Sequence, residues 1–597
     1  MGAAASSSSF AFDMAAQPAV RPPVMCKPLS DIQPISFDRA FGARIFTSNL
    51  PILRLPTELF PSITRYLSSR DLASLSLVDR DCRLLAALSQ FKSLQLNIAN
   101  SKCRFIRDCH PSVPDDSEYV RACVRRLRVV MHPESGVRRS DGPPNPISLP
   151  LSSTSGECTF ACIDYFQAMG DVIEKALPNL HVLDFDIPYA LPPTLLQSIF
   201  RSPVKHFRLN GTMLIDDVRT PISSGFMPLE TLNLKISWPG MHDRGNAFEL
   251  YGHLLRHASA TLQRLELHGR GLNDHIQIPD DMPAFPHLRS LVLNRFSDNH
   301  DRLLDLFLGS NSRIHTLAID SSTVSTKVFL RNRGYMCSLD QFCWLNCTTV
   351  DGADEILTFL SDNIHLSTFH VLHGLPTTFI NNELLPLVQA SFKSLTSLKL
   401  VWAAPDIAED SLQAISSIHS LRSLWLSAGN QDVFRNTWEI DTESILSHLS
   451  PLRNLETLAF SKDTYKIDIH PLAPVFCDYY ATKVLPTDVD LTRYLSSEEL
   501  HRYKDAETAP YDEAISRQVK IRRVAWERWH AEQMLVFANR FAQMFVRLRW
   551  CFIGQLAFSI DPDNGKGARM AFMDSVVRNP CLRSLHKRMS LNTWQHA

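Results

Sequence analysis

Apolar residues in the middle of the chain recur in a six-residue pattern, apolar-x-x-apolar-x-apolar. The alternation in its second half predicts a short strand whose apolar side chains face one side of a sheet. The residues between successive copies are numerous enough to form a returning helix or turn. Eleven copies begin at Leu180, Val204, Leu229, Leu262, Leu288, Ile314, Leu339, Leu366, Leu395, Leu421 and Leu455.

The spacing of the copies indicates the fold class. Their starting points lie 24 to 34 residues apart, and most spacings fall in the period of about 20–29 residues that leucine-rich repeats show. The array therefore resembles a leucine-rich-repeat protein, which implies an α/β fold: a curved solenoid with one strand and one helix or turn per repeat. Two upstream copies, at Phe91 and Val124, extend the array to residues 91–462. Within it, residues 133–156 are rich in proline, serine and glycine and are predicted to form a flexible insertion.

The pattern stops after residue 462. Residues 463–597 are predicted to form a helical extension that caps the array, because a solenoid needs a cover for its last repeat. Ser496 and Glu499 fit a capping box at the start of a helix. A late copy of the pattern at Leu548 is a candidate closing repeat within this cap.

A different periodicity precedes the array. In residues 49–96 apolar side chains recur every three or four positions, which predicts short helices, with Ser68 to Asp71 as the turn and N-cap between two of them. Residues 1–48 are small, polar and dotted with proline, and we expect this tail to be disordered. Gly2 fits the loose N-myristoylation pattern, although an unmodified tail rich in alanine and serine is the simpler interpretation.

The sequence of the helical block resembles the F-box motif. It reads Leu55-Pro56-Thr57-Glu58-Leu59, then Ile63, Leu67, Asp71-Leu72, Leu75-Ser76-Leu77-Val78 and Arg80. Pro61 departs from the motif, since it removes an amide donor unless the first helix begins there. The resemblance implies a non-catalytic subunit of an SCF-type cullin–RING ubiquitin ligase, which binds the SCF adaptor through this block and a protein substrate through the repeats. The residues that would contact the adaptor are Leu55, Pro56, Glu58, Leu59, Ile63, Leu67, Leu72, Leu75 and Val78.

Alternate side chains of each predicted strand point away from the core, to the concave side of the solenoid. They are polar and partly basic in the first half of the array and apolar in the second half, where Trp425 would anchor a substrate. The open alternative is that the C-terminal helical segment folds back and covers this apolar ridge. Arg208, Lys235 and Arg264 are also candidates for a patch that binds a phosphorylated substrate. The candidate substrate-binding residues are Arg208, Lys235, Arg264, His268, Leu345, Leu372, Val401 and Trp425.

Composition and motif searches narrow the function classes. The 597 residues carry a net charge of −1, so no overall field attracts nucleic acid, and no apolar stretch is long enough to span a membrane. Thirteen cysteines in so long a chain indicate a reducing compartment, cytoplasmic or nuclear. Cys337, Cys343 and Cys347 lack the paired spacing of a zinc site, and no nucleotide-binding or hydrolase motif is found.

We therefore expect a recognition protein without cofactor, metal or catalytic centre. Two alternatives stay open. One is a leucine-rich-repeat interaction scaffold with no role in ubiquitylation, in which the helical block is only an end cap. The other is an enzyme whose site has no recognised motif.

Overall fold

The computed structural model describes much of the helical block, the repeat array and the C-terminal extension. The described residues are 34–42, 48, 50–64, 66–97, 118–130, 166–187, 190–210, 213–214, 228–235, 252, 254–268, 282–294, 302–308, 313–321, 324–345, 352–429, 435–436, 438–461, 467–468, 490–506, 511–554, 556–560 and 569–573. Gly2 and the predicted insertion at residues 133–156 lie outside them.

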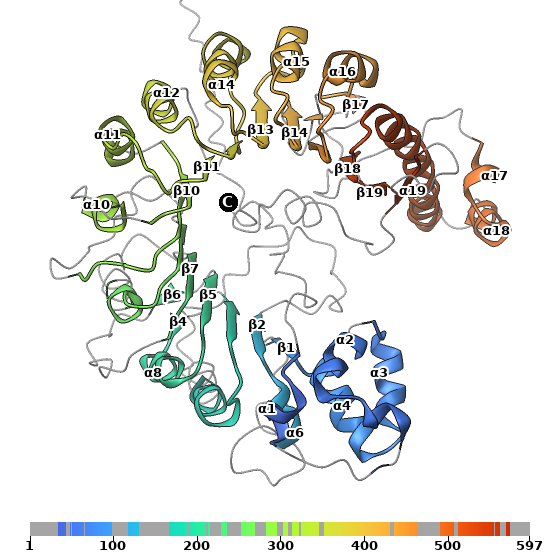
Figure 1. The fold of residues 1–597 in the computed structure, drawn as a ribbon. Helices are drawn as coiled ribbons and strands as arrows, with labels where there is room; N and C mark the ends of the chain where they lie inside the picture. The colour runs from blue at the N-terminus through green and yellow to red at the C-terminus, as the bar shows by residue number, and fades with distance from the viewer. Residues whose placement is uncertain are drawn as a thin grey trace, which may run out of the picture.

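One sixteen-stranded sheet follows the inner side of an arc (Figure 1). The strands from β1 to β18 pair in parallel, and β18, β19 and β20 pair antiparallel at the far end. The strands, in sheet order, are β1 (Ser93–Asn97), β2 (Arg126–Val130), β3 (Val182–Asp186), β5 (His206–Asn210), β7 (Thr231–Lys235), β8 (Arg264–His268), β9 (Ser290–Asn294), β10 (Thr316–Ile319), β11 (Gln341–Trp344), β12 (Thr368–Val371), β13 (Ser397–Trp402), β14 (Ser423–Ala428), β16 (Thr457–Ser461), β18 (Trp550–Ile553), β19 (Leu556–Ile560) and β20 (Ala571–Met573).

The register of the sheet follows the six-residue pattern. Each of the eleven copies forms one strand, and the two upstream copies and the late copy form β1, β2 and β18. Leu183 lies opposite Phe207, and Phe207 lies opposite Leu232, so equivalent pattern positions are neighbours across the sheet. These side chains are fully buried in one continuous core. The α/β solenoid of leucine-rich repeats that the spacing predicts is the observed architecture.

Helices and irregular segments return along the outer side of the arc (Figure 1). Their apolar faces pack onto the strands, as Leu195 and Ile199 of α8 do, which closes the core between the two layers. The elements of this layer are η5 (Val172–Ala176), α8 (Pro193–Arg201), α10 (Arg302–Leu308), α11 (Val324–Asn332), α12 (Ala353–Asp362), α13 (Thr377–Phe379), η6 (Ile380–Leu384), α14 (Leu385–Ser391), α15 (Glu409–Ser416) and α16 (Thr442–Leu449). Two small sheets join β4 (Ala190–Leu191) to β6 (Met213–Leu214) and β15 (Arg435–Asn436) to β17 (Ile467–Asp468).

A helical domain precedes the array. Its elements are α1 (Phe37–Phe41), η2 (Pro51–Arg54), η3 (Thr57–Leu59), α2 (Phe60–Thr64), α3 (Ser69–Ser76) and α4 (Arg80–Gln90). Helix α2 begins at Phe60, so Pro61 falls in its first turn, where a missing amide hydrogen costs little. Ser68 caps α3 through a reciprocal capping box with Asp71, as predicted.

Part of the predicted disordered tail is ordered. Residues 34–42 contain α1, and the side chains of Ile35 and Phe37 are buried in the core of the helical domain. The expectation of disorder throughout residues 1–48 is therefore wrong for this segment. Phe37 and Phe41 lie one helical turn apart and contact edge to face, 5.0 Å between ring centroids, and Phe37 packs into the core of the helical domain.

The C-terminal extension contains both helices and strands. Helices α17 (Leu491–Tyr494) and α18 (Ser497–Ala506) pack on α19 (Tyr511–Met544). Ser496 and Glu499 form the predicted capping box, and Phe541 of α19 joins the core of the array. The turn after β18 requires glycine, because Gly554 has a positive φ of 58° and a Cβ there would overlap Met534. Among the described helices, none is long and apolar enough to cross a membrane.

Candidate interaction surfaces

The nine side chains assigned to an adaptor lie at different depths in the helical domain. Leu72 is buried, so it stabilises α3 within the domain and is not available to a partner. The half-buried side chains are Ile63, Leu67 and Leu75. The exposed side chains are Leu55, Pro56, Glu58, Leu59 and Val78.

Exposed apolar residues are concentrated in this small domain. The exposed fraction is 47% for Leu59, 57% for Val78, 80% for Leu77 and 86% for Tyr66. We call these four residues together with Leu55 the apolar surface of the helical domain. Apolar side chains that stay exposed together on one domain mark a contact site where they form a contiguous patch. Tyr66 and Leu77 are absent from the predicted adaptor set, although both belong to the same helical periodicity.

The domain keeps this surface exposed because other apolar residues already fill its core. Leu53, Phe60, Leu85 and Leu88 are almost completely buried together. Cys123 of α6 (Glu118–Cys123), the helix that precedes β2, belongs to the same core. Helix α6 therefore packs into the core of the helical domain, which is a cluster separate from the core of the repeats.

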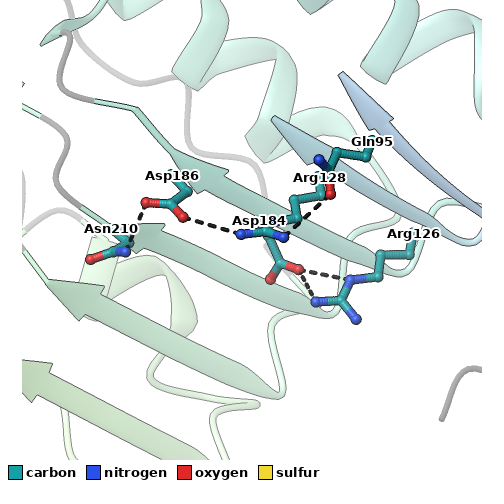
Figure 2. Close-up of polar contacts among 6 residues, drawn as sticks. All are labelled: Gln95, Arg126, Arg128, Asp184, Asp186 and Asn210. Atoms are coloured by element: carbon teal, nitrogen blue, oxygen red, sulfur yellow. Dashed lines mark hydrogen bonds and ion pairs between the residues drawn. The ribbon is translucent and has the colours of Figure 1, made fainter. Parts of the chain in front are cut away.

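The concave face begins with charged pairs between neighbouring strands. Arg126 of β2 donates from Nε to Oδ2 of Asp184 on β3 at 2.7 Å, and both side chains are buried (Figure 2). In the register of the sheet, Arg126 lies opposite Val182, so the arginine reaches diagonally to the carboxylate two residues further along. The pair satisfies two charges that would be costly to bury singly.

A second pair repeats this geometry one position along the same strands. Arg128 donates from Nη2 to Oδ2 of Asp186 at 3.2 Å and from Nη1 to Oε1 of Gln95 at 3.3 Å. Asn210 of β5 donates to the other oxygen of Asp186 at 2.9 Å. Figure 2 shows the resulting chain of polar contacts, which crosses from β1 to β5. Each carboxylate of β3 is thus bound by an arginine of β2.

Glu266 is the centre of a third charged cluster, on β8. It accepts a hydrogen bond from Nε of Arg264 at 2.6 Å and another from the side-chain amide of Asn233. Burial acts to raise the pKa of Glu266, but Arg264 and His268 outweigh it and lower the pKa below its ordinary value. The carboxylate therefore stays ionised inside the cluster.

His268 lies beside Glu266 and is 3% exposed. Its Nε2 is 3.9 Å from Oε2 of Glu266, and neither ring nitrogen has a hydrogen-bond partner. Burial is the main cause that lowers the pKa of His268 below its ordinary value; Glu266 opposes it, and Lys235 and Arg208 have smaller effects in the same direction as burial. His268 is thus a buried imidazole beside a carboxylate.

The second half of the concave face is apolar and buried. Trp425 is 2% exposed, donates from Nε1 to Oγ of Ser461 at 2.7 Å, and holds the ammonium of Lys399 3.2 Å from its ring centroid. The cluster around it comprises Val292, Ala318, Cys343, Leu345, Trp425, Ala459, Trp550, Phe552 and Ala557, with Leu372 packed against them. Because these side chains are buried, the expected solvent-facing ridge is not observed.

The eight predicted substrate-binding residues differ in how exposed they are. Arg208, Lys235, Arg264 and Leu372 are half-buried. The expectation that the others face solvent is wrong, since His268, Leu345, Val401 and Trp425 are each at most 3% exposed. The predicted role of these residues in binding a substrate stays a prediction.

The described C-terminal helices do not cover the apolar half. Ala538, Phe541 and Phe545 of α19 join the core between the sheet and the outer helices, on the other side of the strands from Trp425. Trp550 and Phe552 of β18 extend the concave cluster instead. The alternative that the helices fold back over this ridge is therefore not what the described residues show.

Four charged residues of the concave face are missing from the predicted set. Arg126, Arg128, Asp184 and Asp186 occupy the alternate positions of their strands, and the pattern at Val124 and Leu180 already placed them there. The sequence signal for them was the alternation itself. Among the described residues, no cluster of histidine, cysteine and carboxylate side chains fits a metal ion.

Comparisons with known proteins give fold-level matches alone. No protein-family model and no curated protein matches the chain. A leucine-rich-repeat protein of Leptospira interrogans covers 61% of this chain and 93% of its own length, with 10% identity and a TM-score of 0.25. The leucine-rich repeat-containing protein LegL7 from Legionella pneumophila covers 60% of this chain and 97% of its own, with 13% identity and a TM-score of 0.31.

The PEPR1–AtPEP1 structure matches over 49% of this chain and 40% of its own length, with 12% identity and a TM-score of 0.18. This chain thus spans less than half of that protein. The assignment of leucine-rich repeats rests on the register and period of the sheet itself.

Proposed function

We propose that the chain is an F-box-type substrate receptor. Its helical domain binds the adaptor of an SCF-type ubiquitin ligase, and its repeats bind the protein to be ubiquitylated. The observation that carries the proposal is the apolar surface of the helical domain. Leu55, Leu59 and Val78 fill positions of the F-box motif and remain exposed, whereas the rest of the domain builds a closed core.

The energetics of this surface favour a protein partner. A leucine or valine side chain contributes about 1.5–3 kcal/mol when it is transferred from water into an apolar contact. Leu59, Leu77 and Val78 would each gain part of that amount in a helix-packing interface. The chain itself supplies proximity, because a bound substrate would be held beside an enzyme that another subunit recruits. Such a subunit would act in the cytoplasm or nucleus and have no catalytic residues of its own.

The experiment is co-purification of the SCF adaptor with the intact chain and with two matched variants. Leu59→Asp places a charge in the apolar surface, and because Leu59 is exposed the variant should fold. Val324→Asp is the control, since Val324 is an equally apolar, 76% exposed residue on α11 of the outer helical layer. We expect capture by the intact chain and by Val324→Asp, and loss of capture by Leu59→Asp with an unchanged melting temperature.

A repeat scaffold without a ligase role is the second candidate. The core that the helical domain shares with α6 favours it, because an end cap would pack on the first repeat in the same way. Absence of adaptor capture by the intact, folded chain would establish this candidate and refute the receptor.

A further inference from the structure

Four of the predicted adaptor contacts lie on a short turn between two buried side chains. Leu53 is 5% exposed and Phe60 is 1% exposed, and both belong to the core of the helical domain. Residues 54–59 between them, all of which the structure describes, comprise the end of η2 and the 3-10 helix η3. A single 3-10 turn has poor hydrogen-bond geometry and is not stable by itself. The shape of this turn therefore depends on contacts from outside it.

Thr57 makes such a contact. It is the one half-buried residue among residues 54–59, and the other five are exposed. Its Oγ1 donates a hydrogen bond to Oδ2 of Asp38 on α1 at 3.1 Å. Two of the predicted adaptor contacts precede Thr57 in the turn and two follow it. The hydrogen bond thus ties the middle of the turn to α1.

Helix α1 can hold the turn in place because it is itself anchored in the domain. Ile35 is 3% exposed, and Phe37 is completely buried in the core. The helix contacts η3, α4 and α6. Asp38 directly follows Phe37 in the first turn of α1, so burial of the phenylalanine fixes the backbone that carries the carboxylate.

We propose that Asp38 is a positioning residue for the adaptor: its hydrogen bond to Thr57 holds residues 54–59 in the shape in which their exposed side chains contact that partner. The proposal rests on the receptor function. It adds to that function a role for α1, which lies outside the stretch that resembles the F-box motif. A turn that is already ordered loses less conformational entropy on binding, so its affinity for the partner is higher.

The test compares the affinities of full-length variants for the purified SCF adaptor by surface plasmon resonance. Asp38→Ala and Thr57→Val each remove the hydrogen bond and should each weaken adaptor binding about three- to tenfold. Asp38→Asn keeps an acceptor oxygen and should bind like the parent chain. The double variant should bind no more weakly than either single variant, because both act on the same bond. Equal affinities of the parent, Asp38→Ala and Thr57→Val chains would refute the proposal.

Asp410→Ala is the matched control. Asp410 is an exposed carboxylate in the first turn of α15, as Asp38 is in the first turn of α1, so both variants lose the same interaction with a helix dipole. The control should keep the parent affinity. Melting temperatures are measured in parallel. A lower melting temperature of Asp38→Ala with unchanged adaptor affinity would show a merely structural contact and would also refute the positioning role.

Amide hydrogen exchange without the adaptor separates this proposal from the receptor function. The amides of Leu59 and Phe60 donate to carbonyls within the turn. Both should exchange faster in Asp38→Ala and Thr57→Val than in the parent and Asp410→Ala chains.

The two proposals fail in different ways. If the parent chain captures the adaptor while neither exchange nor affinity changes in the variants, the positioning role is refuted and the receptor function stands. If the parent chain captures no adaptor, the receptor function is refuted, and the role of Asp38 in it is refuted as well.

Discussion

The two halves of the concave face differ in chemistry although the strands are built in the same way. In β3, β5 and β8 the central concave positions are Asp184, Arg208 and Glu266, whereas in β9, β10 and β14 they are Val292, Ala318 and Trp425. The core-facing positions remain apolar throughout. The concave positions thus differ in chemistry while the core-facing positions do not, and concave positions are where a repeat protein can carry its specificity.

The two halves also satisfy their side chains differently. In the polar half, charges on neighbouring strands pair, as Arg126 does with Asp184. In the apolar half, the ammonium of Lys399 lies over the ring of Trp425. A cation over an indole ring keeps its charge while its neighbours stay apolar. This contact helps to stabilise a lysine that is 5% exposed beside an apolar cluster.

The largest loss of stability should come from Trp425→Ala, in the apolar half of the concave face. Removal of a fully buried indole leaves a cavity and should lower the free energy of unfolding by about 3–5 kcal/mol. Trp425→Phe is the milder control, because it retains the ring and loses the hydrogen bond to Ser461. Urea denaturation measures both. A loss below about 1 kcal/mol for Trp425→Ala would mean that the cluster contributes little to stability.

Asp184→Ala should have the next largest effect. It leaves Arg126 buried without its carboxylate and should cost about 3 kcal/mol. The double variant with Arg126→Met should recover most of this loss, since an apolar side chain of similar size replaces the unpaired charge. If the double variant is as unstable as Asp184→Ala in the same denaturation assay, the cost does not come from the unpaired arginine.

A smaller effect is expected from pH. The pKa of His268 lies below its ordinary value of 6.5 in the folded chain. As pH falls through 6.5, the unfolded chain takes up a proton at this residue before the folded chain does. The free energy of unfolding should therefore fall between pH 7.5 and 5.5, by at most about 1.4 kcal/mol per pH unit.

His268→Gln should remove this contribution, and the difference between the two pH profiles isolates it from other groups. Glu266 affects stability in a different pH range. Its pKa is lowered in the folded chain, so the stability that it contributes is lost only below pH 4.5, the ordinary pKa of glutamate. Identical profiles of parent and variant above pH 5.5 would contradict the lowered pKa of His268.

The smallest expected effect is in the reactivity of the cysteines. Burial raises the pKa of the Cys343 thiol, so this residue of the apolar half should resist alkylation in the folded chain. Cys337 is exposed and should react before Cys343. Iodoacetamide labelling followed by peptide mapping gives the order, and denatured protein serves as the control. Rapid labelling of Cys343 in the folded chain would show that the apolar half opens readily.

The repeat array could be predicted because its signal is local and repeated. Each strand needs two apolar side chains at fixed spacing, and one-to-one stacking of equivalent positions follows from the repeat itself, as Leu232 opposite Leu265 illustrates. The order of α1 could not be predicted in this way. Its stability comes from packing Phe37 into a core formed by residues 53–88 and by Cys123, which no short stretch of sequence reveals.

The site was predictable in part for the same reason. Alternation assigned Arg208 and Lys235 to the concave side, but it gave no information on how deeply a concave side chain lies. Trp425 is buried in a cluster that also contains Trp550, which is 125 residues further along the chain (550 − 425). Likewise the diagonal pairing of Arg126 with Asp184 depends on the length of the arginine and on the twist of the sheet.

The core that Cys123 shares with the helical domain has a geometric consequence. Among the described residues, α4 ends at Gln90 and β1 begins at Ser93, so the helical domain adjoins the first strand directly and each described concave position lies at a set distance from the apolar surface. That distance is counted in strands, and one strand adds about 4.8 Å. The solenoid would therefore determine distance. A ligand bound on a given repeat would lie at a separation from the partner of the helical domain that is set by the number of strands between them.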